Sequence, residues 1–242
     1  MTVTTRFASG ALTAVAIGLL IVTFESSEGV NVNAQATQPG AVAAREAAYR
    51  ANNIGVAYLE QYDFAAAMAS FRRALEQDPA LGIARLNLGI ALLYAGQGDA
   101  AKQEIEKARD NLGDRPHPDY VLGLIARAGN QTDEALGAFT RASKLDPTDA
   151  GIAINLGQLY LQQRQYPEAL AAFRAATTAE PYNATAAYGL ATALIRSGAA
   201  AEGKPAMDRF EQLRSSNYST TFSQNYLEQG RYAEAIASTG AE

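Results

Sequence analysis

Apolar residues recur every three to four positions along most of the chain, a spacing typical of amphipathic helices rather than strands. The pattern itself repeats. Asn53-Ile54-Gly55 and Asn87-Leu88-Gly89 lie 34 residues apart, and Asn155-Leu156-Gly157 follows 68 residues later. Val121-Leu122-Gly123 fills the gap in register. A fixed period of this length indicates a solenoid, in which each unit packs mainly against its neighbours.

Each unit is expected to hold two helices joined by a short turn. Asp-Pro or Glu-Pro closes three of the units. Proline stops a helix and drives the preceding residue out of the helical conformation. Five full units and a truncated sixth are predicted at residues 48–81, 82–115, 116–149, 150–183, 184–217 and 218–242.

Small residues fill two columns of the repeat. The eighth position is Gly in four units and Ala in the fifth, and the twentieth is Ala in four units and Gly in the fifth. Large residues such as Phe71, Phe139 and Phe173 share another column. Side chains this small let two helix backbones approach closely, so we predict that the two helices of each unit pack as an antiparallel pair.

The last two units depart from the pattern. In the fifth unit Phe210 replaces a small residue, and Pro205 is expected to bend or break the second helix. The truncated sixth unit keeps Tyr226, Gly230 and Tyr232, and we expect it to end in a short helix. Solenoids normally finish with a polar capping element. This ending therefore predicts either a fragment of a longer protein or an end that docks onto something.

The order of small, aromatic, Ala and Pro columns resembles the tetratricopeptide repeat, over residues 48 to about 238. This resemblance implies an all-α fold, a right-handed superhelical solenoid of antiparallel helix pairs. It also implies a concave face that is lined by the first helix of each unit and used for binding protein or peptide.

Mapping that face onto this chain gives a set that is mostly apolar and aromatic with scattered amides. An apolar patch of this extent, if exposed, marks a contact site. The candidate peptide-binding residues are Tyr49, Asn53, Leu86, Asn87, Ile90, Tyr94, Tyr120, Leu124, Ile154, Asn155 and Tyr188.

The asparagines in this set allow two interpretations. Some family members hold an extended peptide backbone with a column of Asn amides, and Asn53, Asn87 and Asn155 can do so because an amide offers both a donor and an acceptor. Alternatively, each amide bonds within its own repeat. The tyrosines likewise either anchor a partner or pack between repeats. The family's carboxylate clamp is not expected, since only Asn87 matches it.

Composition narrows the possible chemistry. The chain has 242 residues, a formal net charge of −5, no Cys and one His. Thiolate zinc sites, disulfides, cysteine nucleophiles and the HExxH pattern are therefore excluded. Nucleic acid is not an expected partner, because phosphate binding needs clustered Lys and Arg. No serine elbow or phosphate loop accompanies His117, so we expect no catalytic residue, cofactor or metal, and we interpret the chain as not an enzyme.

The N-terminal residues predict export. Residues 11–24 carry no charge. As a helix they span roughly 21 Å, short of the ~30 Å hydrocarbon core of a bilayer. This length is typical of a secretory signal, so we interpret residues 1–36 as a signal for export to the periplasm or outside the cell, and residues 37–47 as an exposed leader. An uncleaved membrane anchor and a buried core helix are the alternatives.

Together these features predict a non-catalytic scaffold that binds a peptide or protein segment on its concave face. One alternative is a structural protein that self-assembles into filaments through its solenoid ends. Another is the recruiting part of a larger exported protein or enzyme. Membrane contact is expected only through the N-terminal segment, if that segment is not removed.

Overall fold

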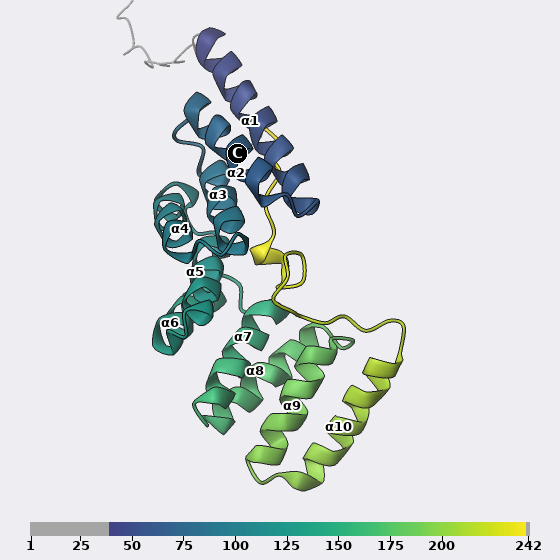
Figure 1. The fold of residues 1–242 in the computed structure, drawn as a ribbon. Coiled ribbons are helices and arrows are strands. Elements are labelled where there is room, and N and C mark those ends of the chain that lie inside the picture. The colour runs from purple at the N-terminus through teal and green to yellow at the C-terminus, as the bar shows by residue number, and fades with distance from the viewer. Residues whose placement is uncertain (1–38, 241–242) are drawn as a thin grey trace, which may run out of the picture. The chain divides into compact units, whose positions relative to one another are not determined.

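The computed structural model describes residues 39–240, which form ten α-helices and one short 3-10 helix (Figure 1). The apolar stretch 11–24 and the expected export signal lie outside the described residues. No helix within the described range combines the length and hydrophobicity needed to cross a bilayer. The helices are α1 (Pro39–Glu60), α2 (Phe64–Gln77), α3 (Gly82–Tyr94), α4 (Gly98–Leu112), α5 (Pro116–Ala128), α6 (Thr132–Leu145), α7 (Ala150–Gln162), α8 (Tyr166–Ala179), α9 (Ala184–Arg196), α10 (Ala200–Ser215) and the 3-10 helix η1 (Arg231–Ala233).

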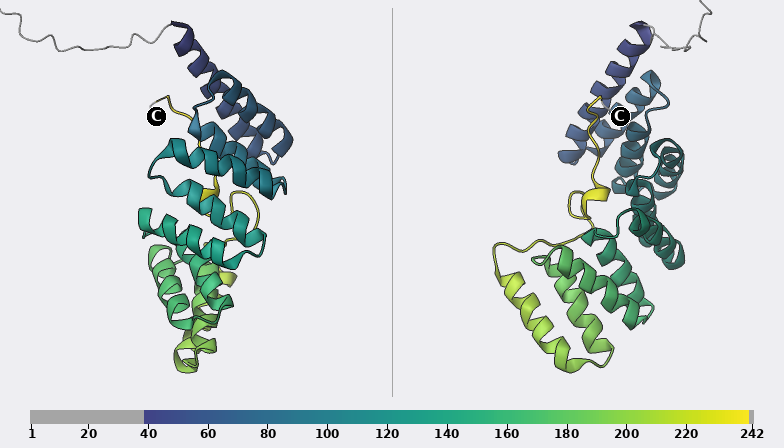
Figure 2. Two further views of the ribbon diagram at one scale, coloured as in Figure 1. Left: turned by 90° about the vertical axis from the view of Figure 1, so that its left-hand side faces the viewer. Right: turned by 180° about the vertical axis from the view of Figure 1, so that it is seen from behind.

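The helices form five successive pairs, α1 with α2 through to α9 with α10 (Figures 1 and 2). Helices α3, α5, α7 and α9 begin at the residues where the 34-residue frame starts a new unit. The predicted all-α solenoid of paired helices is therefore confirmed.

Small residues do allow close helix packing within a pair. A Cβ atom built on Gly123 of α5 would lie 2.7 Å from Cζ of Phe139 in α6. Phe139 is fully buried, and so is Ala135, the small residue one turn before it in α6. The ring of Phe139 thus fills the space that the missing glycine side chain leaves.

The structure corrects two expectations, one about where the first helix begins and one about a break at Pro205. Helix α1 begins at Pro39, so residues 39–47 extend the first helix instead of forming a separate leader, although most of residues 40–47 are exposed. Proline is favoured at the first helical position, and the alanine-rich sequence that follows has high helix propensity. Helix α10 continues through Pro205 to Ser215 without a break. Pro205 is the sixth residue of that helix, so only the hydrogen bond to the carbonyl of Ala201 is lost.

The expected helix of a sixth unit does not form. Residues 217–240, called the C-terminal segment below, contain only η1 and a single parallel bridge between Thr220 and Asn183. An isolated helix of the remaining length is marginal in water, because nucleation is costly. The segment instead turns back from α10 and runs along the solenoid to α1 (yellow in Figures 1 and 2).

Candidate functional site

Two asparagines on successive units hold the main chain of the C-terminal segment. Asn87 of α3 donates from Nδ2 to the carbonyl of Ile236 at 2.8 Å and accepts from the N–H of Ile236 at 2.9 Å. Asn53 of α1 makes the same pair of bonds to Ser238, at 3.1 and 2.7 Å. Alternate residues of an extended chain face the same side, and the residue between them, Ala237, is exposed.

A third amide, that of Asn52, completes this network. Its Nδ2 donates to the carbonyl of Ile236 at 3.1 Å and to Oγ of Ser238 at 3.3 Å. Its Oδ1 accepts from Nδ2 of Asn87 at 2.9 Å. Asn52 and Asn87 are fully buried, and buried amides are costly unless they are hydrogen-bonded. The three asparagines therefore form a polar strip inside an apolar surface, and the strip is satisfied by an extended main chain.

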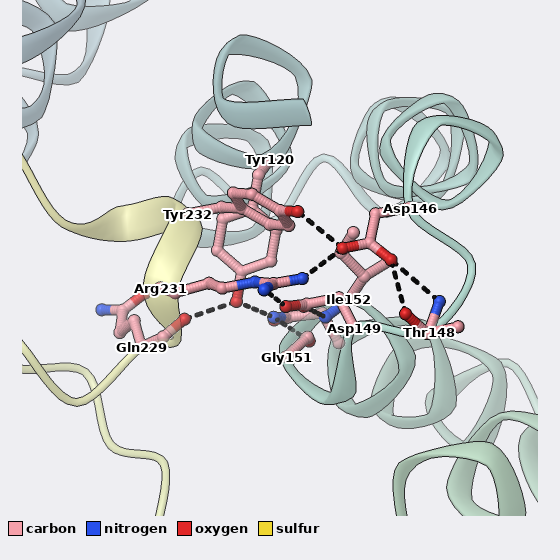
Figure 3. A network of polar contacts seen from close by, with 10 residues as sticks. Tyr120, Asp146, Thr148, Asp149, Gly151, Ile152, Gln229, Arg231 and Tyr232 are labelled. Carbon is pink, nitrogen blue, oxygen red and sulfur yellow. Dashed lines mark hydrogen bonds and ion pairs between the residues drawn. The ribbon is translucent and has the colours of Figure 1, made fainter. Parts of the chain in front are cut away.

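The C-terminal segment lies along α1, α3, α5 and α7, and this surface is called the groove below. Further along it, two carboxylates between α6 and α7 bind Arg231 (Figure 3). Each carboxylate is fixed locally through one oxygen. Oδ1 of Asp149 accepts from the N–H of Ile152 at 2.8 Å and caps α7, and Oδ1 of Asp146 accepts from Thr148. Oδ2 of Asp149 accepts from Nε of Arg231 at 2.9 Å, and Oδ2 of Asp146 accepts from its Nη2.

Tyr232 adds an aromatic contact beside this ion pair. Its hydroxyl donates to Oδ2 of Asp146 at 2.6 Å, and the guanidinium of Arg231 lies 4.7 Å from the centre of its ring. The hydrogen bond from Tyr232 lowers the pKa of Asp146 to about 2, whereas burial raises the pKa of Asp149. Two ionised carboxylates side by side repel each other, so this pair is suited to a cation with several donors, such as a guanidinium.

Tyr120 of α5 makes a further contact with the C-terminal segment. It is fully buried, and its hydroxyl donates to the carbonyl of Gln229 in the C-terminal segment. Nδ2 of Asn155 donates to this hydroxyl at 3.0 Å and to the carbonyl of Gly151 at 2.8 Å. Asn155 therefore follows the second interpretation, because it bonds to its own helix and to its neighbour instead of to an extended main chain.

A cavity of about 660 Å³ remains beside the C-terminal segment, lined by the first helices of the second to fourth units. Arg127 lies at its edge and donates to the amide oxygens of Asn155, Gln158 (3.2 Å) and Gln229 (3.5 Å). The ring of Tyr94 lines the cavity and packs 5.2 Å from that of Tyr226, and burial raises the pKa of Tyr94. The cavity has room for side chains of a bound segment.

The remaining candidates mostly lie along this groove, but not as an exposed patch. Except for Tyr188, each of them is buried in a cluster that also holds residues of the C-terminal segment, or packs against such residues. Leu86 and Ile90 share a cluster with Tyr226, Leu124 shares one with Tyr232, Ile154 lies in a cluster against which Phe222 packs, and the ring of Tyr49 lies near Gly240. Tyr188 lies apart, because its 50% exposed side chain packs on Phe210 of α10, 5.1 Å between ring centres.

The candidate set from the sequence does not include Asn52, Arg127 or the two aspartates, although Asn52 and Arg127 map to the predicted concave face. Helix capping accounts for only one oxygen of Asp149, because the other oxygen accepts from Arg231. One signal was available. The junction 146–149 carries two carboxylates, whereas the corresponding junctions 78–81 and 180–183 carry one each.

His117, the one histidine of the chain, can be used to detect the contact between the solenoid and the C-terminal segment. Its ring lies 4.7 Å from that of Tyr232, and burial, together with the charges of Arg115 and Arg231, lowers its pKa from 6.5 to about 4. A lowered pKa means that the folded state resists protonation, so the free energy of unfolding declines as the pH falls from 6.5 towards 4.

We therefore expect the His117 ring signals of untagged protein, followed by proton NMR, to titrate near pH 4. In Tyr232→Ala the pKa should rise towards 6.5, because the ring that covers His117 is gone. Titration near 6.5 in the unaltered chain would show that the C-terminal segment does not cover this histidine.

No group of three acidic or histidine side chains within residues 39–240 is arranged to hold a metal ion. Models of the tetratricopeptide repeat match residues 58–128, 126–177 and 154–217. No curated protein matches the sequence.

Several solved structures share the fold. A MamA protein is 20% identical with a TM-score of 0.61, over 70% of this chain and 92% of that one. PilF of Pseudomonas aeruginosa is 23% identical with a TM-score of 0.64, over 74% of this chain and 80% of that one. YrrB, described as having an unusual peptide-binding site, is 21% identical with a TM-score of 0.59, over 75% of this chain and 95% of that one.

Proposed function

Because the chain belongs to the tetratricopeptide repeat family, we propose that it is a non-catalytic scaffold that binds an extended segment of another protein. The binding surface is the groove along α1, α3, α5 and α7, in which the C-terminal segment now lies. Export from the cell, expected from residues 1–36, is part of this proposal.

One observation carries the proposal: Asn53 and Asn87 each bind both the N–H and the carbonyl of one residue of an extended chain. Main-chain groups are common to all peptides, so this pair of amides accepts an extended segment almost regardless of its side chains. At about 0.5–1.5 kcal/mol each, four such bonds contribute roughly 2–6 kcal/mol. This is too little for stable binding alone, so apolar contacts along the groove must add to it.

Site-specific photo-crosslinking in the native cells tests this function. A benzophenone side chain in place of Gln158, an exposed residue beside the cavity, should crosslink to a discrete partner protein. The same group in place of Arg73, which is exposed on α2, is the matched control and should not.

The comparison is made in a chain with Arg231→Ala and Ile236→Pro, because the C-terminal segment binds the same asparagines and would otherwise be weakened together with the partner. In that chain Asn53→Ala with Asn87→Ala should lower the crosslinking yield from position 158 at least fivefold, because the main-chain bonds to the partner are lost. The helical circular dichroism signal should stay unchanged. Equal yields from positions 158 and 73, or a yield that ignores both asparagines, would overturn the proposed function.

A further inference from the structure

The C-terminal segment occupies the groove as a ligand would. Its main chain pairs with the asparagine strip at Ile236 and Ser238. Its side chains Arg231 and Tyr232 bind the carboxylates of Asp146 and Asp149, a pair called the acidic site below. Tyr226 is almost fully buried in a cluster of side chains from the first three units. The groove therefore holds two kinds of binding site at a fixed spacing. The asparagine strip binds the main chain, and the two carboxylates bind an arginine that is followed by an aromatic residue.

The acidic site is built for such a pair of residues before the segment arrives. Asp146 and Asp149 are each held through one oxygen by groups of their own loop and helix, so their other oxygens are free to face the groove. Asp149 is buried, and Arg231 comes from 82 residues further along the chain. A lysine would offer a point charge, whereas a guanidinium can donate to both carboxylates at once.

We infer that the C-terminal segment is an internal copy of the partner's binding segment and that the partner must displace it to bind. The partner offers an arginine followed by an aromatic residue to Asp146 and Asp149. An extended stretch that begins about four residues later then pairs with Asn87 and Asn53. This inference rests on the proposed function, because it names the class of segment that the same groove accepts.

Tethering makes the C-terminal segment a strong competitor. A segment joined to its site by a short connection has an effective concentration in the millimolar range. The apparent affinity of a free segment that makes the same contacts, and that alone would bind with micromolar affinity, should therefore be lowered at least tenfold. Weakening the internal copy should reveal the affinity of the groove.

The test uses the full chain and a fluorescent peptide with the sequence of residues 229–240. A released variant carries Arg231→Ala, which removes the ion pair, and Ile236→Pro, which removes the N–H that Asn87 accepts. The matched control carries Arg214→Ala and Ala237→Pro, at an exposed arginine of α10 and at the exposed residue between the two bound ones.

By fluorescence anisotropy, the peptide should bind the released variant at least tenfold more tightly than it binds the unaltered chain or the control. Equal affinity for all three would show that the C-terminal segment does not compete, and would overturn the inference.

A second arm examines the acidic site itself. A peptide with alanine in place of its arginine should bind the released variant at least tenfold more weakly, and so should the original peptide on a released variant with Asp146→Asn and Asp149→Asn. If both keep full affinity, the assigned anchor is wrong.

The proposed function fails in a different way. If the affinity of the peptide does not depend on its arginine but is lost with Asn53→Ala and Asn87→Ala, the groove still binds extended segments. Only the further inference is then contradicted. If the peptide binds no variant while circular dichroism shows all of them folded, both are contradicted.

Discussion

Replacing Gly123 with valine should lower the free energy of unfolding by about 2–3 kcal/mol, the upper range for overpacking a filled core. A Cβ atom at this position would lie 2.7 Å from Cζ of Phe139 and 2.8 Å from both Cε1 and Cε2. It would therefore overlap three atoms of the ring at once. Phe139 is fully buried between α5 and α6. The helices would have to separate, and the packing of the third unit would be lost.

Urea unfolding followed by circular dichroism measures this effect. Gly137→Ala is the matched control, because its added Cβ meets only the guanidinium of Arg141, at 3.6 Å. Alanine is the better helix former by up to about 1 kcal/mol, so the control should be as stable as the unaltered chain or slightly more stable. If Gly123→Val unfolds at the same urea concentration as the unaltered chain, close helix packing is not what the glycine column provides.

Replacing Gly230 with alanine should release the C-terminal segment from the groove. Gly230 has a φ of +90°, which side-chain-bearing residues rarely adopt, and an added Cβ would lie 2.9 Å from the hydroxyl of Tyr120. The substitution therefore strains the backbone and pushes away the hydroxyl that binds Gln229. Because Arg231 follows directly, the ion pair with the two aspartates should be lost as well.

Limited trypsin digestion with mass spectrometry measures this release. A protease needs an extended, accessible chain, so cleavage after Arg231 should be at least tenfold faster in Gly230→Ala. Gly198→Ala is the control, since Gly198 has a nearly equal φ of +88° but nothing within 4 Å of an added Cβ. Cleavage that is equally fast in both variants would mean that the contact with Tyr120 does not hold the segment.

Much of the fold could be predicted because it depends on local, repeated features. The glycine and alanine columns set the distance between paired helices, and the same column brings a fully buried Phe71 into contact with Gly55. Asn53 and Asn87 could be singled out for the same reason, since a residue at a fixed position in each unit faces the same groove.

The C-terminal segment could not be predicted, because its contacts join residues far apart in sequence. Asn53 and Ser238 are separated by 185 positions. Tyr226, Gly230 and Tyr232 match the repeat pattern, and that local match favoured a sixth helical unit. Pairing with buried amides and with two carboxylates outweighs the weak tendency of so short a stretch to form a helix.

Hydrogen exchange of three neighbouring amides tests the central claim most directly. By NMR, the N–H groups of Ile236 and Ser238 should exchange at least tenfold more slowly than that of Ala237, relative to unstructured peptide. Asn87→Ala should remove the protection of Ile236, and Asn53→Ala that of Ser238, because each amide accepts from one of these donors. Equally fast exchange at all three positions would show that the asparagine strip does not hold an extended main chain.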